Sequence, residues 1–112
     1  MEKRELLEAA ARAAGLFDNL IWWELAGCFQ IKGEMPAKLW NPLEDDGDAL
    51  RLAVKLGIGI EWWESMPNGI CGRVNFDGNG VILMENVHDK AAILRRAIVR
   101  AAAAIDAQRR ET

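Results

Sequence analysis

The chain has 112 residues, of which 51% are hydrophobic and 28% are charged. This length and composition predict one globular domain over residues 1–112, because a chain of this size builds a single hydrophobic core. They exclude collagen-like, disordered and disulfide-stapled proteins. The net charge of −3, from 17 acidic and 14 basic side chains, provides no strong field that would compel binding to nucleic acid or an anionic membrane.

The sequence gives no sign of membrane insertion or export. No segment offers the roughly 20 apolar residues that a membrane-spanning helix needs. Residues 1–5 mix both signs of charge and lead into an alanine-rich amphipathic segment, whereas a secretory signal has an uninterrupted apolar stretch. We therefore expect a cytoplasmic protein without a membrane partner.

The first predicted elements are a helix and two short strands. Apolar residues at spacings of three and four predict a helix over residues 2–15, which Gly15 ends. Residues 20–25 and 28–31 are rich in aromatic and branched side chains, which indicates two strands or one bulged strand. Residues 32–36 then form a turn.

A second helix, three strands and a third helix follow. Acidic residues, which favour the positive end of a helix, precede an apolar stripe that ends at Gly57. Strands are predicted over 58–63, 70–76 and 81–87, the last two joined by a hairpin at 77–80. The apolar spacing after Asp89, a good N-cap, predicts a helix over 90–108.

The predicted order is therefore α-β-β-α-β-β-β-α. This order indicates an α/β (α+β) protein with a mixed, mostly antiparallel sheet and helices packed against it. Alanine-rich helix faces at 9–14 and 101–104 suit close packing, either within the core or across a symmetric homodimer.

Four of the five tryptophans form two adjacent pairs, Trp22-Trp23 and Trp62-Trp63. Neighbouring residues of a strand point to opposite faces of the sheet, so each pair places one indole on either side. We expect helices to cover both faces and bury these rings. The alternative is that one ring of each pair lines a binding surface.

The sequence offers few groups for catalysis or metal binding. It has one histidine, His88, and two distant cysteines, whereas a tetrahedral zinc site takes about four such ligands. His88 has no Ser or Cys beside it, as a nucleophile with an adjacent base would require. The carboxylates Asp45, Asp46 and Asp48 suit a helix start better than a metal site. We expect no enzyme activity, no metal and no cofactor.

Residues 40–56, with the sequence WNPLEDDGDALRLAVKL, resemble the W-x-P-L-x-D-x-x-D-A-L-x-L segment of small phage and prophage proteins that carry the phage ABA sandwich domain. The stretches ELLEAA at 5–10 and RRAIVRAAA at 95–103 are also similar to that family. The resemblance implies a three-layer α/β/α sandwich and a phage gene context. It implies no agreed biochemical activity.

The same motif has a structural interpretation. Trp40 would pack under a sheet edge, and Pro42 would fix the approach of the chain to the second helix. Asp45 or Asp46 would cap that helix, and Asp48 would oppose the positive end of its dipole. We favour this interpretation over a carboxylate active site.

We consider two binding functions. In the first, a small phage accessory protein counters host defence by sequestering a nucleotide-derived signal or by blocking a host protein. Its ligand site would combine stacking indoles with arginines that pair with phosphate. The candidate residues are Trp22, Trp62, Trp63, Arg51 and Arg73.

The second, less favoured function is nucleic-acid binding for regulation or packaging of phage DNA. Arg96 and Arg100 lie four residues apart on the predicted C-terminal helix, away from its apolar stripe. The net charge of −3 and the lack of another basic cluster count against this function.

Overall fold

The computed structural model describes residues 2–65, 69–76, 80–84 and 89–111, with the backbone alone at 63–65, 69–71 and 83–84. Several predictions fall outside the described part: residues 77–79 of the turn predicted at 77–80, residues 85–87 of the strand predicted at 81–87, His88, and the side chains of Trp63 and Cys71. The helices are α1 (Lys3–Ala13), α2 (Asp46–Leu56) and α3 (Lys90–Glu111), with a 3-10 turn η1 (Phe17–Asn19) after α1. The strands are β1 (Leu20–Trp23), β2 (Cys28–Ile31), β3 (Leu39–Trp40), β4 (Gly59–Ser65), β5 (Gly69–Phe76) and β6 (Gly80–Met84).

The strands form two separate antiparallel sheets. The N-terminal sheet has the order β1-β2-β3, and the C-terminal sheet has the order β4-β5-β6. In the N-terminal sheet Trp22 lies opposite Phe29, which lies opposite Trp40. In the C-terminal sheet β4 and β5 form a long hairpin that pairs Gly59 with Asn75 at one end. The chain is thus an α+β protein.

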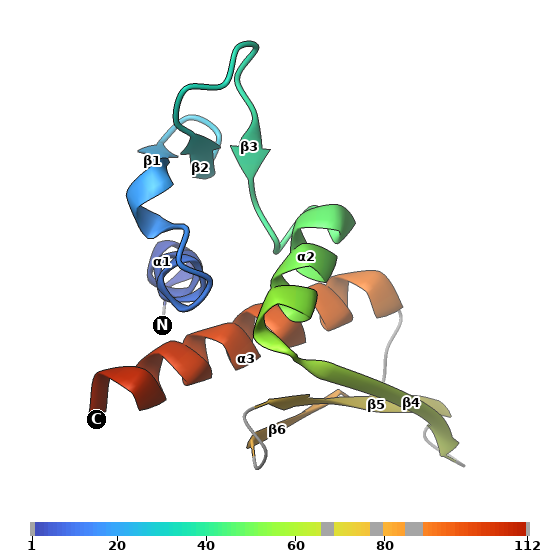
Figure 1. The fold of residues 1–112 in the computed structure, drawn as a ribbon. Coiled ribbons are helices and arrows are strands. Elements are labelled where there is room, and N and C mark those ends of the chain that lie inside the picture. Colours follow the sequence, from blue (N-terminus) through green and yellow to red (C-terminus); the bar gives the residue numbers. More distant parts are fainter. Residues whose placement is uncertain (1, 66–68, 77–79, 85–88, 112) are drawn as a thin grey trace.

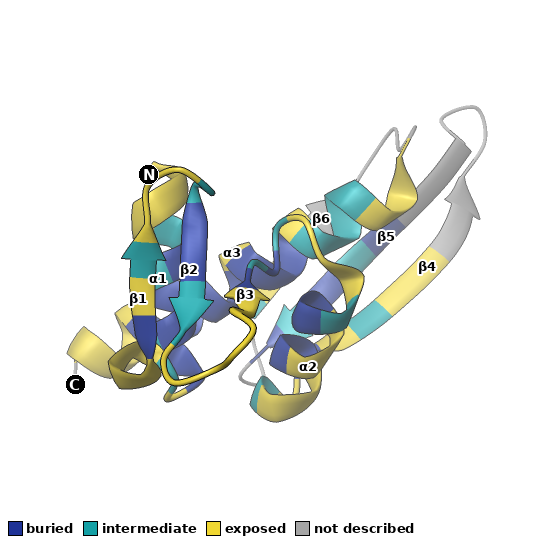
Figure 2. Cartoon of the chain, turned by 90° about the horizontal axis from the view of Figure 1, so that it is seen from above, coloured by how far each residue is buried: buried dark blue, intermediate teal, exposed yellow. Residues whose placement is uncertain are grey.

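Helix α3 is the centre of the molecule (Figure 1). It contacts α1 and α2 on one side and strands β5 and β6 on the other. The N-terminal sheet lies above α1, on the side away from α3 (Figure 1). The helices therefore lie between the two sheets, and buried positions concentrate along α1, α2 and α3 where these elements meet (Figure 2).

Alanines allow α1 and α3 to pack closely. Ala10 and Ala11 of α1 and Ala101 and Ala102 of α3 are fully buried. Small side chains let two helix backbones approach, so the contact leaves little room for larger residues. The alanine-rich faces that the sequence assigns either to the core or to a homodimer therefore lie in the core of one chain.

Polar contacts hold the ends of the same two helices. Arg12 of α1 lies 3.2 Å from the buried carboxylate of Asp106 on α3. Nη1 of Arg109 donates to the carbonyl oxygen of Ala13, at 2.9 Å. A basic side chain near the last carbonyls of a helix also opposes the negative end of the helix dipole. Both contacts fix α1 along the C-terminal half of α3.

The single mixed sheet expected from the sequence is wrong, because the described strands form two sheets. Strand β3 lasts only two residues, since Pro42 follows closely and removes a backbone donor. Helix α2 then intervenes before β4, so each group of strands pairs with its neighbours along the chain. The observed order contains one more strand than predicted, at Leu39–Trp40.

Burial of the paired indoles by helices on both sheet faces is also not what the structure shows. Trp23 is 40% exposed and Trp62 is 39% exposed. Trp22 is half-buried against Phe29, with ring centroids 5.2 Å apart. The reason is that α1 and α2 pack on α3, so the three helices do not enclose either sheet from both sides.

Candidate functional site

The motif at 40–51 forms a rigid corner between β3 and α2. Asp45 has extended backbone angles, φ −111° and ψ 120°, and its side chain accepts a hydrogen bond from the backbone N–H of Asp48 at 2.8 Å. This is the geometry of a helix N-cap. Pro42, just before the cap, is fully buried. Of the two caps the sequence allows, the structure uses Asp45.

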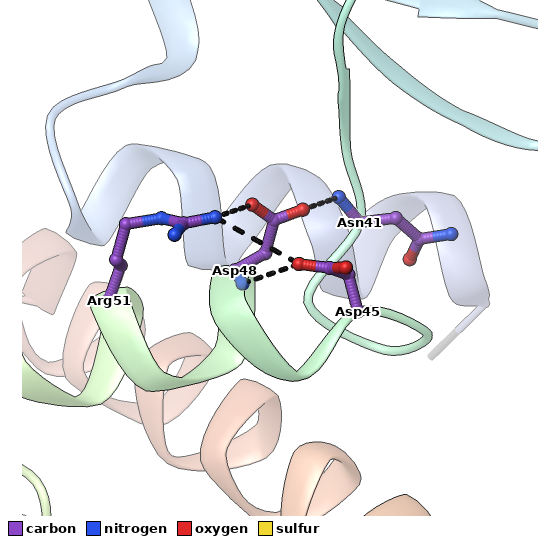
Figure 3. Close-up of polar contacts among 4 residues, drawn as sticks. All are labelled: Asn41, Asp45, Asp48 and Arg51. Carbon is purple, nitrogen blue, oxygen red and sulfur yellow. Dashed lines mark hydrogen bonds and ion pairs between the residues drawn. The ribbon is translucent and has the colours of Figure 1, made fainter.

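Asp48 closes this corner with a buried carboxylate (Figure 3). One carboxylate oxygen accepts from the backbone N–H of Asn41 at 2.9 Å, and the other accepts from Arg51 at 2.7 Å. The Arg51 guanidinium also lies 3.9 Å from the carboxylate of Asp45. A buried charge needs such hydrogen bonds to offset lost hydration. We call residues 41–51 the corner.

Asp46 forms an ion pair with a residue of α3. It pairs with Arg95 of α3 at 2.5 Å, and Nε of Arg95 donates to the carbonyl oxygen of Leu43 at 2.9 Å. Arg95 thus attaches the corner to the central helix. Asp46 thus faces Arg95, whereas Asp45 and Asp48 share Arg51. Within the described ranges, no group of three or more His, Cys, Asp or Glu side chains is placed to hold a metal ion.

The corner rests on the N-terminal sheet through Trp40. Trp40 is buried and packs near Phe29, with ring centroids 6.3 Å apart. Cys28, the neighbour of Phe29, is also buried. Burial raises the pKa of the Cys28 thiol above its ordinary value of 9.0, and the nearby Lys3 ammonium opposes this shift only in part. The thiol is therefore a packed, protonated group near neutral pH.

A cleft of about 870 Å³ opens between the N-terminal sheet and α2. Its apolar part includes Leu16, Ile31, Trp40 and Leu52, and charged side chains surround this part. We call it the α2 cleft. The charged lining residues are Glu34, Lys38, Glu44, Asp45, Asp48, Arg51 and Lys55.

Two lysines come from opposite walls of the α2 cleft. Lys38 precedes β3, and Lys55 lies in the last turn of α2. Both are exposed, and among the described residues neither ammonium has an ion pair or a hydrogen bond. By contrast, Arg51 is held by Asp48. The cleft therefore offers two cations, beside an apolar wall, that have no partner among the described residues.

The candidate ligand residues from the sequence do not meet in one place. Arg51 lines the α2 cleft. Trp22 lies in the N-terminal sheet, where its indole N–H donates to Glu24 at 2.7 Å. Arg73 pairs with Glu61 across β4 and β5 at 2.8 Å.

Trp62 also lies apart from the α2 cleft. It pairs with Gly72, one position from the pair between Glu61 and Arg73, so Trp62 and Arg73 belong to opposite faces of the C-terminal sheet. The backbone of Trp63 is in β4.

The sequence predictions missed Lys38 and Lys55. The signal available for Lys55 was its spacing from Arg51 on one face of the helix.

Comparison with models of known protein families, with curated proteins and with solved structures gives no match to this chain. Among the described helices, none is long and apolar enough to cross a lipid bilayer.

Proposed function

We propose that this chain acts by binding and that the α2 cleft holds its ligand. The cleft volume of about 870 Å³ lies within the roughly 300–1,000 Å³ of ligand pockets, which combine apolar walls with a few polar groups. The observation that carries the proposal is the pair of lysines, Lys38 and Lys55, on opposite walls, which have no partner among the residues that the structure describes. We assign these two ammonium groups to an anionic group of the ligand, within a lining that holds four acidic and three basic side chains.

A nucleotide-derived signal has the chemistry for this cleft. Its phosphate would lie between Lys38 and Lys55, and its base would rest on the apolar wall near Leu39 and Trp40. Arg51 would leave Asp48 only at the cost of a buried, unpaired carboxylate, so we assign it to positioning the corner. Trp22, Trp62, Trp63 and Arg73 would then lie outside the ligand site.

The biological setting of the proposal comes from the resemblance at residues 40–56. On that basis we propose a phage or prophage protein of the phage ABA sandwich family that acts in the host cytoplasm. Sequestering a nucleotide-derived signal would counter a host defence. Blocking a host protein through the same cleft is the alternative within this setting.

Non-enzymatic action is part of the proposal. The buried Cys28 thiol has a raised pKa, and a thiol rather than a thiolate is a poor nucleophile. The carboxylates of Asp45 and Asp48 accept hydrogen bonds from the backbone and from Arg51. Carboxylates that already accept these hydrogen bonds are better suited to fixing the conformation of the corner than to transferring protons.

Calorimetric titration with ATP and with cyclic di-GMP tests the proposal. We expect saturable binding of at least one, and the double variant Lys38→Glu, Lys55→Glu should weaken it by at least ~10-fold, because two attractive charges become repulsive. Lys90→Glu, at the start of α3 and outside the cleft, is the matched control. Equal affinity in wild type and double variant, or no binding of either nucleotide, contradicts the nucleotide proposal.

A homodimer is a further proposal about partners. Because the alanine-rich faces are buried within one chain, a dimer would use other surfaces, such as the exposed apolar side chains Ile21, Trp23 and Leu39 of the N-terminal sheet. Native mass spectrometry of the protein purified from cells reports the stoichiometry and any retained small molecule together.

Nucleic-acid binding is the second candidate function. The observation in its favour is that Arg96 and Arg100 are both exposed on α3. Fluorescence anisotropy with a labelled DNA duplex at several salt concentrations tests it. Affinity that falls steeply with salt supports this function, because released counterions drive such binding. The absence of binding at low salt excludes it.

A further inference from the structure

A second concavity of about 520 Å³ lies between α1 and α3. Its apolar lining consists of Leu6, Leu43 and alanines of α3, and its other lining residues are Lys3, Arg96 and Arg100. We call it the α1–α3 groove. It shares no lining residue with the α2 cleft. The corner separates the two, since Leu43 lines the groove while Asn41 and Glu44 line the cleft.

The charged lining of this groove is entirely basic. Arg96 and Arg100 lie one helical turn apart on the same face of α3. Within the described part of the chain, neither guanidinium has an ion pair or a hydrogen bond, and the same holds for Lys3. Lys3 stands in the first turn of α1, where a cation opposes the helix dipole. Stabilisation of α1 therefore does not explain why a lysine stands at position 3.

Arg96 and Arg100 differ in this respect from five other arginines of the described part. Arg4, Arg12, Arg51, Arg73 and Arg95 each pair with a carboxylate. Acidic side chains outnumber basic ones, by 17 to 14, so partners are not scarce. Unpartnered arginines beside an apolar floor leave the forked donors of the guanidinium free for a bidentate anion.

We infer that the α1–α3 groove is a second binding site, which takes a compact phosphorylated organic molecule. Its phosphate pairs with Arg96 and Arg100, and its apolar part covers Leu6 and Leu43. A long polyanion fits less well, because the flanking basic residues of α3 are engaged: Arg95 pairs with Asp46, and Arg110 lies 3.9 Å from Asp106. The basic surface is thus confined to the groove.

An NMR titration with phenyl phosphate tests this inference. We expect saturable shifts of backbone amides at 3–6 and 96–107. The double variant Arg96→Gln, Arg100→Gln keeps helix propensity and removes both charges, and it should weaken the binding by at least ~10-fold. Circular dichroism verifies that this variant is folded.

The variant Lys38→Glu, Lys55→Glu separates this inference from the proposal for the α2 cleft. Its affinity for phenyl phosphate at the groove should equal that of wild type, whatever the outcome at the cleft. Unchanged affinity in Arg96→Gln, Arg100→Gln overturns the inference. So does an α3 surface that binds only a DNA duplex, with a steep salt dependence, and leaves phenyl phosphate unbound.

Discussion

Asp48 shows at the scale of one residue how the corner is held. Its buried carboxylate joins the end of β3, through the N–H of Asn41, to the face of α2, through Arg51. The carboxylate also lies inside the first turn of the helix, where a negative charge is stabilised by the dipole. The α2 cleft borders on these atoms, so its shape depends on this residue.

Replacing Asp48 by Asn should therefore lower the free energy of unfolding by about 1–3 kcal/mol, because buried donors lose a charged acceptor. Asp46→Asn is the matched control: that carboxylate is mostly exposed and pairs with Arg95, and its loss should cost less than ~1 kcal/mol. Urea denaturation followed by circular dichroism measures both. Equal losses in the two variants would contradict the role of Asp48.

The Cys28 thiol should make the free energy of unfolding depend on pH. Because burial raises its pKa above 9.0, the folded thiol keeps its proton at pH values where the unfolded thiol has lost it. Its contribution is complete below pH 9 and is lost as the pH rises above 9. Between pH 8 and 10.5, unfolding free energy should fall less in Cys28→Ala than in wild type. Parallel curves would show that the thiol contributes nothing.

Both ends of helix α2 are set by identified residues, Asp45 at the start and Gly57 at the end. Gly57 ends it with φ +68°, a left-handed conformation that disfavours side chains. Gly57→Ala should cost about 1 kcal/mol of stability. In Gly59→Ala the nearest atom to the new Cβ is 3.9 Å away, and the change should stay within ~0.5 kcal/mol. Thermal unfolding compares them; a larger loss at Gly59 would contradict this account.

The contact between α1 and α3 predicts intolerance to larger side chains. Ala102 is fully buried on α3, the helix that packs against α1, so Ala102→Leu should destabilise the protein by about 1–3 kcal/mol through overpacking. Ala107 is exposed on the same helix, and Ala107→Leu should change stability by less than ~0.5 kcal/mol. Chemical denaturation of both variants checks the difference. A tolerated leucine at 102 would mean that the helices are not closely packed.

The helices were predictable because their signals are local. Apolar spacing and caps predicted 2–15 and 90–108, and the structure has Lys3–Ala13 and Lys90–Glu111. The cap of α2 was predictable as one of two aspartates, since either spacing satisfies the first-turn amides. Strand β3 was not predicted, because two residues give no alternating pattern.

At the scale of the whole molecule, the arrangement of the elements depends on contacts that the sequence pattern does not encode. The six strands divide into two sheets on either side of α2 in the chain, with β1 to β3 before it and β4 to β6 after it. Here α1 and α2 both pack on α3, and the sheets stay separate. Lys38 and Lys55 both line the α2 cleft only because of this arrangement, so the sequence indicated Arg51 but not the site around it.

The α2 cleft is the ligand site that we propose. NMR of the isotope-labelled wild-type protein, titrated with ATP and then with cyclic di-GMP, tests it most directly. The account predicts saturable shifts at the backbone amides of 38–41 and 51–55, absent in the variant Lys38→Glu, Lys55→Glu. Shifts confined to the C-terminal sheet, around Trp62 and Arg73, or no shift with either nucleotide, would contradict it.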